Sequence, residues 1–161
     1  MIFNMYNPQA EKEYKEEVIQ INRVSKKTKG GNQMRFSALV VVGDRKGRVG
    51  AALSKAPDVA GAIRKAFAGA KRKMIKINLK GNTIPYYVEE KFSAAKIILK
   101  PAPPGTGIVA GGPMRVVLEA VGIKDAVGKI LGTGNKISNV YATIRALEKI
   151  EKISSKRNNN K

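Results

Sequence analysis

The sequence contains no cysteine and no histidine. The missing cysteine excludes disulfides and thiol nucleophiles, and the absence of both residues excludes the Cys/His zinc sites of small domains. Without histidine, an enzyme would depend on carboxylate, lysine or tyrosine groups for acid–base chemistry. We therefore expect a protein that is not an enzyme and that holds no metal and no cofactor.

Long apolar runs and tryptophan are missing as well. No run approaches the roughly 18 apolar residues that a membrane-spanning helix needs. The amino-terminal region carries Glu11, Glu13, Glu16 and Glu17, which fits neither a signal peptide nor a transit peptide. We therefore expect a soluble cytoplasmic protein that contacts no membrane and takes no small-molecule substrate.

Acidic residues are few. The 161-residue chain has 31 Lys and Arg against 12 Asp and Glu, which gives a formal net charge of +19. Residues 18–88 hold sixteen of these cations but only two acids, Asp44 and Asp58. A chain this basic predicts a polyanionic partner. Its 43% content of hydrophobic residues is enough to build packed cores.

Two stretches in the first half suit strands of a sheet. Residues 18–21 alternate apolar and polar side chains, and residues 36–42 begin with that alternation and end as an apolar run. The intervening residues 22–31 contain four cations, no acid and a Gly30-Gly31 pair that permits positive φ. We expect a hairpin loop that neutralises phosphates, and the alternative is a solvated hairpin whose lysines only maintain solubility.

A second turn is predicted at residues 43–47, where glycine stands at both ends and Asp44 follows the first. The turn leads into a strand over residues 49–53, so we expect a three-stranded antiparallel sheet. Its cations are Arg45, Lys46 and Arg48. We expect them to add to the cations of the first loop.

A helix is predicted to begin at Pro57-Asp58, because proline suits the first helical position and an acid suits the positive end of the helix dipole. It ends near residues 71–73, whose positive charges suit the opposite end. The apolar residues form one stripe that covers the sheet: Val59, Ala62, Ile63, Ala66, Phe67, Ala70 and Met74. Three antiparallel strands under one basic helix resemble a double-stranded-RNA-binding domain without its first helix.

A second unit is predicted from Ile75 onward, and the fold class is therefore α+β. Its expected strands cover residues 75–79, 84–88, 95–99 and 123–131. One helix runs from Pro113 to Gly122, and Ser138 or Asn139 caps the last helix. This gives a four-stranded sheet with two helices on one face. The expected divisions are a flexible arm over 1–14, a first domain over 15–74, a second over 75–153 and a flexible basic tail over 154–161.

The stretch Gly105-Thr106-Gly107-Ile108-Val109-Ala110 fits the dinucleotide fingerprint, with Asp125 about twenty residues further on. In that fingerprint the helix begins within the glycines, whereas here Pro113 delays the helix by several residues. We therefore expect no dinucleotide site. A glycine-rich surface with few charges is better suited to close packing against another protein or an RNA backbone.

Two long motifs carry a resemblance to a known family. The first comprises Asn22-Arg23-Val24-Ser25-Lys26, Lys29-Gly30-Gly31, Phe36 to Asp44, and Gly47-Arg48-Val49-Gly50, and the second runs from Gly105 to Arg115. On these motifs the chain resembles, from about Val18 to Ile150, the fifth-protein family of the bacterial small ribosomal subunit. The resemblance implies a double-stranded-RNA-binding-like domain followed by a domain of β-β-β-α-β-α order.

The resemblance also implies partners. It implies binding to 16S ribosomal RNA, with residues 22–31 at the head–body junction near the spectinomycin site, and a place lining the entry path of messenger RNA. It implies that residues 105–115 contact the fourth small-subunit protein, at a contact linked to decoding accuracy, among other neighbours. The residues expected to contact RNA are Asn22, Arg23, Ser25, Lys26, Lys27, Thr28, Lys29, Gly30, Gly31, Arg45, Lys46, Arg48 and Lys55. The residues expected to contact protein are Gly105, Thr106, Gly107, Gly111, Gly112, Met114 and Arg115.

One stretch departs from the family pattern, because residues 50–56 read Gly-Ala-Ala-Leu-Ser-Lys-Ala where the family usually alternates glycines. Side chains there argue against close contact between RNA and the backbone at Ala52 and Ser54. Two other function classes stay open. The chain could be a protein-interaction module whose glycine-rich loop is the functional surface. An enzyme that uses Tyr86, Tyr87 or Lys100 is a remote third class, because no base or metal group stands at useful spacing.

Overall fold

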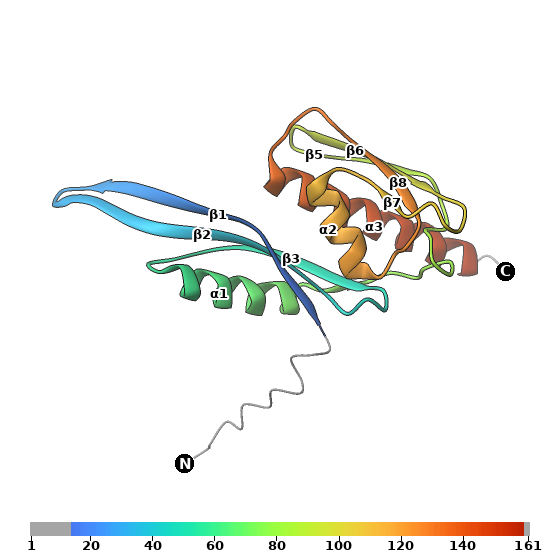
Figure 1. The fold of residues 1–161 in the computed structure, drawn as a ribbon, viewed down its shortest axis with the longest axis horizontal. Helices are drawn as coiled ribbons and strands as arrows, with labels where there is room; N and C mark the ends of the chain where they lie inside the picture. Colours follow the sequence, from blue (N-terminus) through green and yellow to red (C-terminus); the bar gives the residue numbers. More distant parts are fainter. Residues whose placement is uncertain (1–13, 160–161) are drawn as a thin grey trace, which may run out of the picture.

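The computed structural model describes residues 14–159 and has the α+β architecture that the sequence predicts (Figure 1). The first unit comprises β1 (Lys15–Thr28), β2 (Gly31–Gly43), β3 (Arg48–Ala56), α1 (Val59–Arg72) and β4 (Ile75–Lys76). The second unit comprises β5 (Val88–Phe92), β6 (Ala95–Pro101), β7 (Ile108–Val109), α2 (Gly112–Val121), β8 (Ala126–Leu131) and α3 (Lys136–Asn159). The strand orders of the two sheets are β1-β2-β3-β4 and β5-β6-β8-β7.

The elements stack in layers. α1 covers one face of the first sheet, and α2 and α3 lie between the other face of that sheet and the second sheet (Figure 1). Strand β2 is therefore buried on both faces: Val40 and Val42 pack toward α1, whereas Leu39 and Val41 join the core around α2 and α3. Burial on two faces is why this strand is a continuous apolar run in the sequence.

The two units share one core, although the sequence predicts two small domains. Leu39, Val41 and Val49 of the first unit belong to the same buried cluster as the apolar residues of α2, α3 and the second sheet. Main-chain hydrogen bonds also join the units, from Arg45 N to the Ala120 carbonyl (3.0 Å) and from Gly47 N to the Val121 carbonyl (2.9 Å). The first unit is thus packed directly against the second.

Helix α1 follows the predicted stripe. Asp58 is its N-cap, and a carboxylate oxygen of Asp58 accepts a hydrogen bond from Gly61 N at 2.8 Å. Pro57 therefore precedes the cap and is not the first helical residue. The inward face consists of small residues, Ala62, Ala66 and Ala70, which allow the helix to lie close to the sheet.

The second unit has the predicted β-β-β-α-β-α order, but two of its first three strands differ from the prediction. Ile75 and Lys76 pair with β3 and extend the first sheet. The predicted strand over 84–88 is replaced by β5, which begins only at Val88, since Pro85 lacks the N–H that a strand ladder uses. The third strand is β7, which pairs parallel to β8.

Helix α2 ends at Gly122 as predicted, with Gly122 in the left-handed region at φ 100°. Helix α3 begins earlier than predicted, because the Asn135 side chain accepts a hydrogen bond from Ile137 N at 3.1 Å and Asn139 is buried inside the helix. The helix continues through Asn159, where the sequence predicts a loose tail from Ser154. The predicted flexible arm over 1–14 lies outside the described residues, apart from Tyr14.

Candidate nucleic-acid interface

The predicted basic loop is a two-stranded arm. β1 and β2 pair without interruption from Gln20 opposite Leu39 to Thr28 opposite Gly31, so only Lys29 and Gly30 form the turn. β3 ends with Ala56 opposite Phe36, and the arm beyond that point has no third strand. Thr28 lies five residues past Arg23, so the arm extends about 16 Å beyond the end of β3 at about 3.3 Å per residue. It projects from the folded body (Figure 1).

The prediction of a loop over residues 22–31 is wrong, because all of these residues except Lys29 and Gly30 belong to paired strands. The strand ladder, rather than side-chain burial, holds the arm in shape. The side chains of the arm are exposed or only partly buried. Thr28 Oγ1 donates a hydrogen bond to the Gly31 carbonyl at 2.8 Å and closes the turn. Gly31 has φ 128° and open space around its α-carbon, so glycine is required there by the backbone conformation and not by crowding.

The arm has two faces. Because Val40 and Val42 face α1 and strand side chains alternate, Arg23 and Lys27 lie on the α1 side of the arm and Lys26 lies on the opposite side. The Arg23 guanidinium donates to the Met34 thioether sulfur at 3.1 Å. Adjacent lysines of the arm thus point to different surfaces.

The predicted cations do not form one surface. Lys55 joins Ser25 and Lys26 in a groove at the base of the arm. The second turn, with Arg45, Lys46 and Arg48, lies at the other end of the sheet, because β2 runs from the arm at Gly31 to that turn at Gly43. These cations therefore do not add to those of the arm on one surface, and contact of Arg45, Lys46 and Arg48 with RNA stays a prediction.

The second turn packs against the C-terminal end of α2. Asp44 stabilises the turn, because Asp44 Oδ1 accepts hydrogen bonds from Lys46 N (2.8 Å) and Arg48 N (2.9 Å). Lys15 and Arg115 both donate to Glu119 of α2, and these hydrogen bonds hold the pKa of Glu119 below its ordinary value. This turn is part of the junction between the units.

Arg35 and Gln33 are not among the predicted RNA-contacting residues, yet they line the same groove as Lys26 and Lys55. Both could have been found by pairing the strands outward from the Lys29-Gly30 turn, which sets Val24 opposite Arg35 and Lys26 opposite Gln33. The departure at Ala52 has a structural reason: Ala52 is buried under α1 and faces Gly69. Its backbone is not available to RNA.

The glycine-rich stretch from Gly105 to Gly112 is exposed for most of its length. Gly105 and Gly107 have φ of 88° and 74°, which glycine adopts without strain. Thr106 donates from both its amide and its hydroxyl to the Pro103 carbonyl, at 3.3 and 2.8 Å. The stretch is therefore an ordered turn that exposes backbone.

Two residues of the predicted protein contact behave differently. Met114 is fully buried and points toward Gly128, whose added Cβ would lie 2.2 Å from the Met114 sulfur. Met114 is a core residue, so the prediction that its side chain contacts a partner protein is wrong. Arg115 is exposed, and its Nε donates to Glu119 at 3.0 Å.

Asp125 supports the glycine-rich turn. The residue is buried, and its Oδ1 accepts a hydrogen bond from Gly107 N at 2.9 Å, while Ala126 N donates to the Gly107 carbonyl at 3.1 Å. The acid that matches the dinucleotide fingerprint therefore has a structural partner, and α2 begins only at Gly112. Both observations agree with the expectation of no dinucleotide site.

Replacing Asp125 with alanine is expected to lower the free energy of unfolding by about 1–2 kcal/mol, because Gly107 N–H loses its acceptor. Asp125→Asn retains a side-chain oxygen at the same place and is expected to cost less. Urea unfolding measures both changes, and hydrogen exchange at Gly107 N–H reports the turn. Equal stability of the two variants and unchanged exchange would show that Asp125 does not support the turn.

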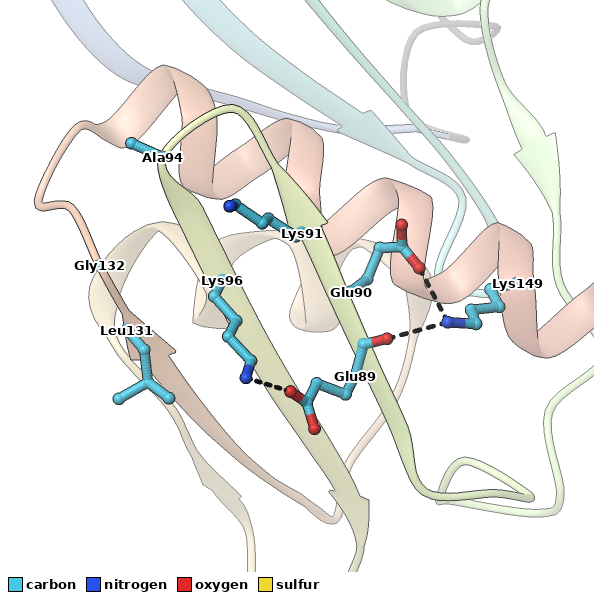
Figure 2. A pocket seen from close by; sticks show the side chains of 8 residues that line it. All are labelled: Glu89, Glu90, Lys91, Ala94, Lys96, Leu131, Gly132 and Lys149. Atoms are coloured by element: carbon cyan, nitrogen blue, oxygen red, sulfur yellow. Dashed lines mark hydrogen bonds and ion pairs between the residues drawn. The ribbon is translucent and has the colours of Figure 1, made fainter.

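A hollow of about 610 Å3 lies on the second unit and is lined by Glu89, Glu90, Lys91, Ala94, Lys96, Leu131, Gly132 and Lys149. All of its charged side chains except that of Lys91 pair with one another (Figure 2): Lys96 contacts Glu89, and Lys149 donates to the Glu89 carbonyl and to Glu90, at 3.0 and 3.1 Å. The hydrogen bond and charge of Lys96 lower the pKa of Glu89.

No group of three or more metal-ligating residues occurs within residues 14–159. None of the helices over that range has the length and apolar character to cross a membrane.

Comparison with known proteins identifies the family to which the chain belongs. Residues 14–78 match the family described as ribosomal protein S5, N-terminal domain, and residues 90–159 match ribosomal protein S5, C-terminal domain. The small ribosomal subunit protein uS5 of Chloroflexus aurantiacus is 49% identical over 138 residues, which cover 86% of this chain and 78% of the relative. That of Ruegeria pomeroyi is 49% identical over 142 residues, 88% of this chain and 75% of the relative. Both domain matches and the two relatives show that the chain belongs to the ribosomal protein S5 family.

Proposed function

We propose that the protein anchors 16S ribosomal RNA through the arm of β1 and β2. As a member of the S5 family it is a structural constituent of the small ribosomal subunit and works in the ribosome, in the cytoplasm, and not as an enzyme. The finer proposals concern which surfaces meet RNA and which meet protein.

One observation carries the RNA proposal. Lys26 and Lys29 project on the exposed arm, and neither of them forms an ion pair in the described part of the chain. Some cations elsewhere are paired, as Lys71 is with Glu16 at 2.9 Å. A lysine that neutralises a phosphate releases counterions from the RNA, which favours binding. No aromatic residue lies between residues 22 and 35, so contact with phosphates and RNA shape would dominate over base stacking.

The glycine-rich turn supports a second part of the proposal. Its exposed backbone and ordered hydrogen bonds suit close packing against a protein, and the fourth small-subunit protein is the partner we propose for Gly105–Gly112 and Arg115. A contact of this kind would link the protein to decoding accuracy. The exposed cations Arg64, Lys65 and Lys73 near or on α1 are suited to messenger RNA along its entry path.

The RNA proposal is tested by the affinity of the full chain for a 16S ribosomal RNA transcript at increasing salt. With about five phosphate contacts, the dissociation constant is expected to rise by about two orders of magnitude between about 50 and 200 mM salt. Filter binding measures this dependence. A dissociation constant that hardly changes with salt would contradict anchoring by phosphate contacts.

A further inference from the structure

A shallow groove of about 320 Å3 lies at the base of the arm, lined by Val24, Ser25, Lys26, Gln33, Arg35 and Lys55. Val24 is opposite Arg35, Lys26 is opposite Gln33, and Lys55 is opposite Ser37. Five of the lining residues, Val24, Lys26, Gln33, Arg35 and Lys55, therefore share the face of the sheet that points away from α1. Ser25 pairs with Met34, and its side chain points to the α1 side. The groove lies where β3 ends and the arm continues with two strands.

Three strands each contribute one cation to this groove. Arg35 is central, because Lys26 and Lys55 are its diagonal neighbours on the two adjacent strands, at about 7–8 Å between backbone positions. Like charges this close repel one another, and no acid lines the groove. Within residues 14–159 none of the three cations forms an ion pair. An anion in the groove would remove this repulsion.

The other lining groups suit a sugar–phosphate chain. Arg35 carries a planar guanidinium that can donate two parallel hydrogen bonds to a phosphate. Gln33 is neutral and can donate to or accept from a ribose hydroxyl. The opposite face of the arm differs, because there Arg23 is engaged with Met34 and Lys27 is opposite Asn32.

We propose that this groove binds the sugar–phosphate backbone of one RNA strand, with Arg35 on a phosphate and Lys26 and Lys55 on its two sides. The inference rests on the proposed function and adds a sidedness to it. The face of the arm that carries Arg35 meets the RNA backbone, and the face that carries Lys27 does not.

Lys26→Ala and Lys27→Ala form a matched pair, because they remove the same charge at adjacent positions on opposite faces. Binding of the full-length variants to a 16S ribosomal RNA transcript is measured at several salt concentrations. Lys26→Ala, Arg35→Gln and Lys55→Ala are each expected to weaken binding about tenfold, the effect of one charge-assisted hydrogen bond. Each is also expected to reduce the salt slope by about one, whereas Lys27→Ala changes the slope little.

The outcomes separate this inference from the proposed function. Equal losses for Lys26→Ala and Lys27→Ala, or unchanged binding for Arg35→Gln, would overturn the groove while leaving RNA anchoring by the arm intact. A wild-type chain that does not bind the transcript would overturn both. All four positions are exposed, and circular dichroism checks that each variant is folded.

Discussion

Replacing Lys26, Lys27 and Lys29 together with alanine is expected to weaken binding to 16S ribosomal RNA by about two orders of magnitude at about 0.1 M salt. Each lysine that contacts a phosphate contributes about 0.7–0.9 to the slope of log affinity against log salt. The triple variant is therefore expected to lose about two units of slope, one from Lys26 in the groove and one from Lys29 in the turn, since we place Lys27 on the face that does not meet RNA. The measurement is filter binding of wild type and variant over the same salt series.

The control for this experiment removes the same charge elsewhere. Lys91, Lys124 and Lys129 are exposed residues of the second unit and form no ion pair in the described range. Their joint replacement with alanine lowers the net charge equally but leaves the arm intact. If both triple variants bind equally weakly, net charge rather than the arm determines affinity, and the proposed role of the arm fails.

Replacing Gly43 with alanine is expected to lower the free energy of unfolding by at least about 3 kcal/mol. A Cβ at this position would lie 2.1 Å from the Ala120 carbonyl oxygen and 2.5 Å from the Ala120 carbonyl carbon. Both are backbone atoms at the C-terminal end of α2, so they cannot rotate away as a side chain would. The substitution therefore forces the two units apart, and this exposes the apolar surface of their shared core.

Gly112→Ala is the matched control for Gly43→Ala. A Cβ at Gly112 meets nothing within 4 Å, and the residue is the first of α2. Alanine there is expected to leave stability unchanged or to raise it by up to about 0.5 kcal/mol. Urea unfolding compares the two variants, and hydrogen exchange at Arg45 N–H, which donates to Ala120, reports the junction. If Gly43→Ala lowers the free energy of unfolding by less than about 1 kcal/mol, the backbone at Ala120 moves aside at little cost and the two units are not forced apart.

Much of the fold was predictable from sequence because its signals are local. The stripe of α1, the end of α2 at Gly122 and the strands β6 and β8 all follow from spacing and turn residues within a few positions. The predicted strand over residues 84–88 is absent from the structure although its composition suits a strand, because Pro85 removes a ladder hydrogen bond. The assignment of Ile75 and Lys76 to the second sheet is wrong for a different reason. The sheet that a strand joins depends on a distant partner, which here is β3.

The candidate site divides in the same way. The cationic content of residues 22–31 is visible in the sequence, but the residues were expected to form a loop. Arg35 was not found, because it is brought to Lys26 and Lys55 only by the register of three strands. Met114 looked like part of an exposed motif, yet the packing of α2 against β8 buries it.

The sequence by itself determined the excess of positive charge, the lack of thiol and imidazole chemistry, and the positions of most helices and turns. These properties depend on composition and on interactions between near neighbours in the chain. Only the tertiary structure decided that the two units share a core, that the basic stretch is a paired arm, and that Lys26 and Lys27 face opposite sides. Those features arise from contacts between residues far apart in the chain, which periodicity and local propensity do not encode.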